Sequence, residues 1–164
     1  MNFLPELAQW LQQTDFAIAI KESDWMFQAL ETLHVLALAL VVGSIAMVDL
    51  RLLGLYSRDR PVTDLMEEAL PWTWIAFVFA AISGTLMFVS KAVAYYENWP
   101  FRFKILLLGL AGINVLFFHF KTYRSVANWN VGNAPSSAKV AGGLSLLFWV
   151  AVVTLGRWIG FTTK

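Results

Sequence analysis

The sequence contains no cysteine and few charged residues. Without cysteine there is no disulfide, thiolate metal ligand or cysteine nucleophile. Charged residues make up 14% of the chain and hydrophobic residues 59%, which is outside the usual composition of soluble domains. No phosphate-binding loop is present and the basic residues form no single patch, so nucleotide and nucleic-acid binding are not indicated. The composition therefore predicts a protein that lies in a lipid bilayer.

Four long apolar runs support this prediction. A membrane-spanning helix needs about 20 mainly apolar residues. Backbone polar groups in lipid must be satisfied within their own segment, which favours helices in runs rich in Leu, Ala and Phe. We therefore expect an all-α fold, an integral membrane four-helix bundle formed by residues 25–164. The expected spans are about 27–50, 72–95, 103–120 and 140–159.

Residues 1–24 have a different pattern from the spans. Phe3, Leu7 and Trp10 recur at helical spacing between polar residues, which predicts an amphipathic helix on the membrane surface. No early Lys or Arg precedes an apolar core, so we expect the first span to act as its own insertion signal. Between the first two spans, Pro61 and Pro71 are expected to act as helix breakers, with a short helix between them.

Tryptophans are expected to mark the two membrane faces, because Trp collects at membrane interfaces. We name these faces the terminal side, which holds both chain ends, and the loop-one side, which holds the first loop. Trp149 lies deep in a span and is expected to pack in the core. If Lys104 and Arg157 are enclosed in the bundle, the basic residues favour a cytoplasmic loop-one side and outside termini. The terminal-side tryptophans are Trp25, Trp99 and Trp158, and the loop-one-side tryptophans are Trp72, Trp74 and Trp129.

Ionisable residues gather at the terminal side of the spans. Glu31 and His34 are three residues apart and share a helix face, and Lys104 and Arg157 are expected at a similar depth. Imidazole is a common haem-iron ligand, a desolvated lysine can ligate a metal, and arginine suits carboxylates such as haem propionates. Met87 is another candidate ligand. This group of side chains predicts a haem b site, with His34 bound to iron.

A second polar group is expected at the loop-one side, formed by Asp49, Arg51, Asn114 and His119. Asp49 beside His119 would orient the imidazole ring. At 1.5 Å per residue, His34 and His119 differ in depth by roughly 15–20 Å, so one chain cannot use both to bind one haem.

Each of these residues also has a structural interpretation. Lys104 could be a snorkelling anchor at a helix start, and His119 could be an interface residue. Asp49 and Arg51 could form a local charge pair, and His34 could bond to Glu31.

Three stretches carry resemblances to known families: ETLHVLALALVVGSIAMVDLRLLGL, WTWIAFVFAAISGTLMF and NWPFRFKILLLGLAGINVLFFH. They resemble a group of small uncharacterised bacterial four-span inner-membrane proteins. A His early in span one with a Lys early in span three is also similar to the HemJ-type protoporphyrinogen oxidases and their CopD-like relatives. That resemblance implies a b-type haem at His34 and Lys104. The DLRLLG end of span one departs from the oxidase pattern.

The leading functional hypothesis is a membrane haem protein that transfers electrons or oxidises a small molecule. In it Lys104 is the second ligand or a propionate partner, Arg157 holds a propionate and Glu31 supports His34. The alternative is a small transporter or a proton- or metal-handling module that uses polar sites at both ends. A third hypothesis is an accessory subunit that docks a partner protein. A homo-oligomer is expected to form through the close-packing surfaces of Gly109, Gly112, Gly156 and Gly160.

Overall fold

The computed structural model of the chain describes residues 3–163. This part of the chain is helical and contains no strand, which confirms the all-α fold. The α-helices are α1 (Phe3–Gln12), α2 (Asp15–Glu22), α3 (Met26–Leu53), α4 (Val62–Ser90), α5 (Ala92–Glu97), α6 (Trp99–Phe117) and α7 (Ser136–Thr162); a π-helical turn η1 (Phe118–Thr122) and a 3₁₀ turn η2 (Tyr123–Asn128) continue α6.

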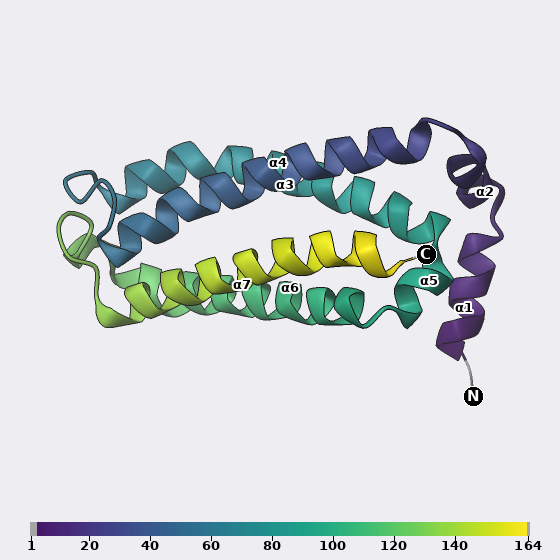
Figure 1. Cartoon of the computed structure of the whole chain (residues 1–164). Coiled ribbons are helices and arrows are strands. Elements are labelled where there is room, and N and C mark those ends of the chain that lie inside the picture. The colour runs from purple at the N-terminus through teal and green to yellow at the C-terminus, as the bar shows by residue number, and fades with distance from the viewer. Residues whose placement is uncertain (1–2, 164) are drawn as a thin grey trace.

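The four long helices form two pairs (Figure 1). Helix α3 packs along α4, α6 packs along α7, and the contact between α3 and α7 joins the pairs. The short helices α1, α2 and α5 lie at the terminal side together with the end of α7, and the longer loops lie at the opposite end. The Gln12 side chain accepts a 3.1 Å hydrogen bond from the Val93 N–H, which fixes α1 against α5.

The outer surface of this bundle is suited to lipid. Four helices are long and apolar enough to cross a membrane: α3, α4, α6 with its continuation to Asn128, and α7. Large apolar side chains point outward along them; Leu36 exposes 65% of its surface and Ile113 and Leu147 each expose 63%. In water such a surface would drive aggregation, whereas hydrocarbon surroundings remove that cost.

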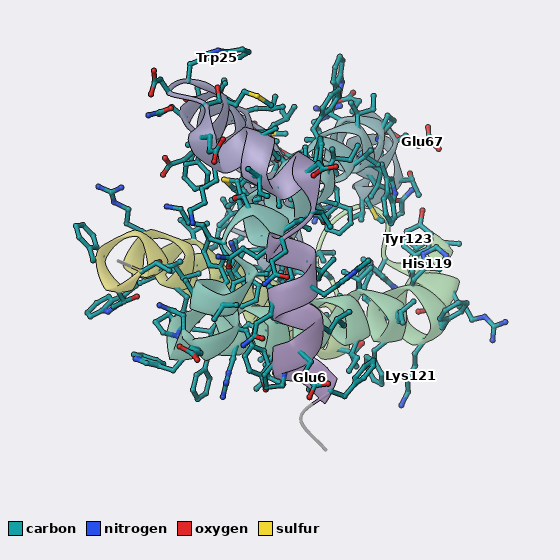
Figure 2. All side chains as sticks on the ribbon, turned by 90° about the vertical axis from the view of Figure 1, so that its right-hand side faces the viewer. Glu6, Trp25, Glu67, His119, Lys121 and Tyr123 are labelled. Carbon is teal, nitrogen blue, oxygen red and sulfur yellow. The ribbon has the colours of Figure 1, made fainter. Side chains whose placement is uncertain are left out.

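Helix α4 differs from the sequence prediction because it continues through Pro71. Proline leaves the carbonyl four residues earlier without its helical donor. That carbonyl belongs to Glu67, an exposed residue near the start of α4, where water can replace the lost donor (Figure 2). The expected short helix before Pro71 is therefore part of α4, and the helix ends at Ser90 instead of residue 95.

Helix boundaries at two turns have local causes. Asn98 precedes α6, and its side-chain oxygen accepts a 3.2 Å hydrogen bond from the Phe101 N–H. This bond satisfies one of the free donors at the helix start. Gly54 ends α3 in the left-handed conformation at φ 74°, which glycine adopts without a steric penalty.

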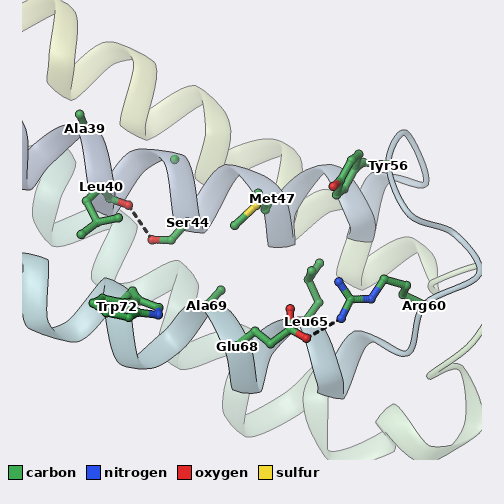
Figure 3. Close-up of a pocket in the computed structure, with 11 residues that line it drawn as sticks. Ala39, Leu40, Ser44, Met47, Tyr56, Arg60, Leu65, Glu68, Ala69 and Trp72 are labelled. Atoms are coloured by element: carbon green, nitrogen blue, oxygen red, sulfur yellow. Dashed lines mark hydrogen bonds and ion pairs between the residues drawn. The ribbon is translucent and has the colours of Figure 1, made fainter.

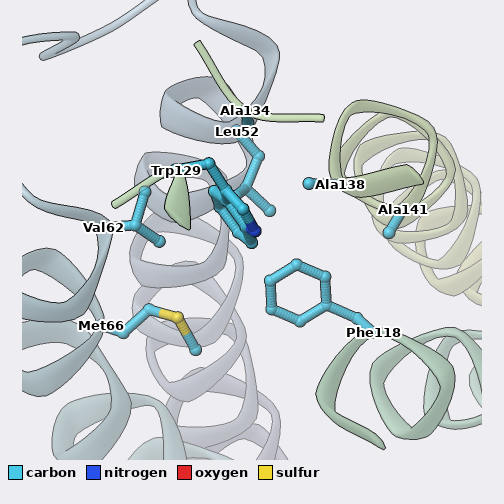
Figure 4. Close-up of a cluster of buried hydrophobic side chains, with 8 residues drawn as sticks. All are labelled: Leu52, Val62, Met66, Phe118, Trp129, Ala134, Ala138 and Ala141. Carbon is cyan, nitrogen blue, oxygen red and sulfur yellow. The ribbon is translucent and has the colours of Figure 1, made fainter. Parts of the chain in front are cut away.

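A cluster of buried apolar side chains fills the loop-one side (Figure 4). Trp129 lies at its centre between Leu52 and Phe118, and only 8% of it is exposed. Its indole N–H donates a 3.1 Å hydrogen bond to the Ser125 hydroxyl. The expected role of Trp129 as an interface marker is therefore corrected, because the turn before it folds the indole into the core.

Trp149 is buried in a second cluster with Val41, Ala76 and Val152, as the sequence predicted.

Candidate functional site

His34 lies on α3 and faces α4. Its Nδ1 is 3.0 Å from the Ser83 hydroxyl oxygen. A Cβ atom added at Gly84 would lie 3.0 Å from the imidazole Cε1 and 3.8 Å from Nε2. The ring therefore occupies the space that the missing side chain of Gly84 leaves open, and its position depends on that glycine.

The hydrogen bonds of Ser83 favour one tautomer of His34. The Ser83 hydroxyl donates to the Phe79 carbonyl at 2.6 Å, so its single hydrogen is already used. The Ser83 oxygen must then accept from the imidazole, which places the ring hydrogen on Nδ1. The lone pair remains on Nε2. This is the tautomer that a histidine needs in order to bind a metal through Nε2.

Lys104 reaches the same region from the other helix pair. It lies on α6, and its Nζ would be 3.5 Å from a Cβ atom at Gly156 of α7. Within residues 3–163 the single ion pair joins Arg60 to Glu68, so the ammonium has no carboxylate partner there. His34 and Lys104 thus lie near the terminal-side ends of α3 and α6 (Figure 1), each beside a glycine of the adjacent helix.

The other two residues expected at this site, Glu31 and Arg157, are exposed at the surface. Arg157 is exposed, and its guanidinium lies over the aromatic ring of Phe161, 5.0 Å from the ring centroid. Glu31 is also exposed and lies near Tyr95 of α5. Burial, together with the Glu31 charge, raises the pKa of the Tyr95 hydroxyl. The predicted group of four is therefore reduced to the pair His34 and Lys104.

Asp49 is buried where α3 crosses α7. Only 5% of the residue is exposed, and Ser145 of α7 lies beside its carboxyl group. In the described part of the chain its Oδ2 atom has no hydrogen-bond partner. A Cβ atom at Gly142 would lie 3.1 Å from the Asp49 carbonyl oxygen, so glycine permits this close crossing.

Arg51 has a structural role, although it was expected at the second polar site. It is fully buried and donates three hydrogen bonds to backbone carbonyls. Nε donates to Arg60 at 3.0 Å, Nη1 to Gly132 at 3.1 Å and Nη2 to Asn130 at 3.3 Å. The side chain therefore joins the end of α3 to the first loop and to the loop before α7.

Asn114 and His119 do not join Asp49. The Asn114 amide donates to the Ala141 carbonyl at 2.9 Å and links α6 to α7. His119 is exposed on η1 and stacks on Tyr123 with ring centroids 5.6 Å apart (Figure 2). The predicted second site is therefore divided into a buried carboxyl group and separate structural contacts.

Several contact residues were not predicted from the sequence as part of a site. They are Ser83 and Gly84, which contact His34, and Ser145, which lies beside Asp49. The feature of the sequence that could have indicated them is their small size, because Ser and Gly on a neighbouring helix allow a polar side chain to enter a bundle. Among the glycines, Gly109, Gly112 and Gly160 have no atom within 4 Å of an added Cβ. They remain open to a neighbouring molecule, and a homo-oligomer stays a prediction.

The fold and these contacts define a multi-pass, all-helical membrane protein with polar side chains at the contacts between its helices. Within residues 3–163 no group of three or more His, Cys, Asp or Glu side chains is placed to hold a metal ion. The chain belongs to DUF6644, a family of unknown function, which matches residues 17–162. No curated protein and no solved structure matches the chain.

Proposed function

We propose that this protein binds a b-type haem between its two helix pairs, with His34 as an iron ligand. The observation that supports the proposal is the free lone pair on His34 Nε2, since Nδ1 is committed to Ser83. Haem in such a site would supply one-electron redox chemistry. We propose that it serves electron transfer with a redox partner or the oxidation of a small molecule at the membrane.

Lys104 fits this proposal as the second polar group. It enters from α6, opposite the α3–α4 pair that holds His34, and has no carboxylate partner in the described residues. It can serve as a second ligand after losing a proton or as a cation that binds a propionate. Gly84 and Gly156 keep side chains away from both groups.

An absorption spectrum tests the proposal. Protein expressed with ample haem supply and purified in detergent is expected to show a Soret band, with α and β bands after dithionite reduction. His34→Ala is expected to lose most of the Soret absorbance, because it removes the iron ligand.

His119→Ala is the matched control, since it removes the other histidine of the chain from an exposed position. It is expected to keep the wild-type spectrum. Colourless wild-type protein, or an unchanged band in His34→Ala of normal elution volume, would contradict haem binding at His34.

A second candidate function is proton or cation handling, and one observation favours it. The Asp49 carboxyl group is buried with an unpartnered oxygen among the residues that the structure describes. A buried carboxylate is costly unless it binds a proton or a cation, and ionisable residues in spans are often functional. We propose Asp49 with Ser145 as the centre of this activity, without His119.

Proton flux into liposomes that contain the purified protein tests this second candidate. Asp49→Asn keeps the side-chain shape and removes the exchangeable charge, so flux is expected to fall to the level of empty liposomes. Asp64→Asn is the control, because Asp64 is exposed in the first turn of α4. Equal flux in wild type and Asp49→Asn would reject a role for Asp49.

A further inference from the structure

A groove of about 500 Å³ runs between α3 and α4 on the outside of the bundle (Figure 3). Small residues form much of its floor: Ala39 and Gly43 on α3 and Ala69 on α4. An added Cβ at Gly43 would meet no atom within 4 Å, so the groove is open at this point. Leu40 and Trp72 flank its deeper end.

The length and position of the groove suit one lipid chain. From Ala39 to Met47 the groove follows α3 for eight residue steps, which is about 12 Å at the helical rise. One leaflet of the hydrocarbon core is about 15 Å thick. Both helices are membrane-spanning, so the groove opens toward acyl chains.

Opposite charges lie at the other end of the groove. Arg60 Nη2 and Glu68 Oε1 form an ion pair at 2.6 Å, and both side chains are about half exposed (Figure 3). Tyr56 lies beside them. The glutamate holds the pKa of the Arg60 guanidinium above its ordinary value through this hydrogen bond and its charge. A headgroup at this level therefore meets a cation and an anion together.

We propose that the groove binds a phospholipid whose headgroup carries both a phosphate and a primary amine. One acyl chain lies over Gly43, the phosphate contacts Arg60 and the ammonium contacts Glu68. Arginine binds phosphate oxygens with its paired N–H donors. A primary ammonium can donate hydrogen bonds to the carboxylate. When the lipid binds, Arg60 and Glu68 separate from each other, and each then faces an opposite charge of the headgroup.

This arrangement predicts headgroup selectivity. A glycerol headgroup has no cation for Glu68, so its phosphate brings uncompensated negative charge near the carboxylate. A choline headgroup carries a cation without N–H donors. Because exposed ion pairs are weak, we expect phosphatidylethanolamine to bind about two- to fivefold more tightly than phosphatidylglycerol or phosphatidylcholine.

Native mass spectrometry of the full chain in detergent tests the proposal, with the three lipids carrying identical acyl chains. Glu68→Gln is expected to remove the preference for phosphatidylethanolamine. Gly43→Leu fills the groove and is expected to lower the binding of all three lipids. Gly109→Leu is the control, because Gly109 lies on α6 outside the groove and is equally open.

Equal binding of the three lipids by the wild type would overturn the headgroup assignment. Unchanged binding in Gly43→Leu would overturn the groove as the site. A dimer that is lost in Gly43→Leu, without lipid loss, would assign the groove to a second copy of the chain. None of these three outcomes depends on haem, so a failure of this proposal can be distinguished from a failure of the proposed function.

Discussion

Replacing Arg51 with methionine is expected to lower the free energy of unfolding by about 3 kcal/mol or more. Methionine keeps much of the apolar stem but removes all donors, so the three hydrogen bonds to the carbonyls of Arg60, Asn130 and Gly132 are lost together. The Asn130 carbonyl keeps its bond from the Val62 N–H. A hydrogen bond from a charged donor contributes about 1.5–3 kcal/mol. Thermal unfolding of the detergent-purified variant measures the loss as a lower midpoint.

Arg124→Met is the matched control for this prediction. Arg124 lies on the same side of the membrane and is exposed, so the identical change is expected to leave the midpoint within experimental error. If Arg51→Met unfolds at the same temperature as Arg124→Met, the three hydrogen bonds contribute no net stability and Arg51 does not hold the loops.

Gly142→Ala is expected to destabilise the bundle by about 1–3 kcal/mol, because its added methyl group lies in the crossing of α3 and α7. The new Cβ would stand 3.1 Å from the Asp49 carbonyl oxygen and 3.3 Å from the Leu52 Cβ. Neither atom lies at the end of a flexible side chain, so the helices themselves must separate. Thermal unfolding in the same detergent measures this effect.

The adjacent glycine provides the control. At Gly143 an added Cβ would meet only the end of the Leu53 side chain, at 3.9 Å. Gly143→Ala is therefore expected to be neutral or to stabilise by up to about 1 kcal/mol, since alanine restricts the unfolded backbone. A loss of stability in Gly143→Ala equal to that in Gly142→Ala would mean that the Asp49 crossing is not the cause.

Much of the fold follows directly from composition and run length. Four long, mainly apolar stretches predict four helices, and the described part of the chain contains four helices that can span a membrane. The error at Pro71 came from treating proline as a breaker regardless of its place in a helix. Near a water-exposed helix start, the unpaired carbonyl can bind water, so the helix continues.

The site was less predictable because its contacts depend on helix phase and backbone atoms. Depth along the helices placed His34 and Lys104 at the same end of the bundle, and the structure adds that each lies beside a glycine of the adjacent helix. Asp49 and His119 were paired on the expectation that span three is one regular helix over residues 103–120. The helix changes to a π turn at Phe118, which changes the direction of the side chains that follow. The acceptors of Arg51 are all backbone carbonyls, so no residue type in the sequence indicates where its hydrogen bonds go.

The carbonyls that bind Arg51 also impose an order on biosynthesis. Asn130 and Gly132 follow Arg51 by 79 and 81 residues, so the ribosome makes α3, α4 and α6 before either acceptor exists. Until then the guanidinium has only the Arg60 carbonyl from its final set and must find its other partners among water or lipid headgroups. Synthesis of the loop before α7 therefore completes the hydrogen bonds by which Arg51 joins the N-terminal half of the protein to the C-terminal half.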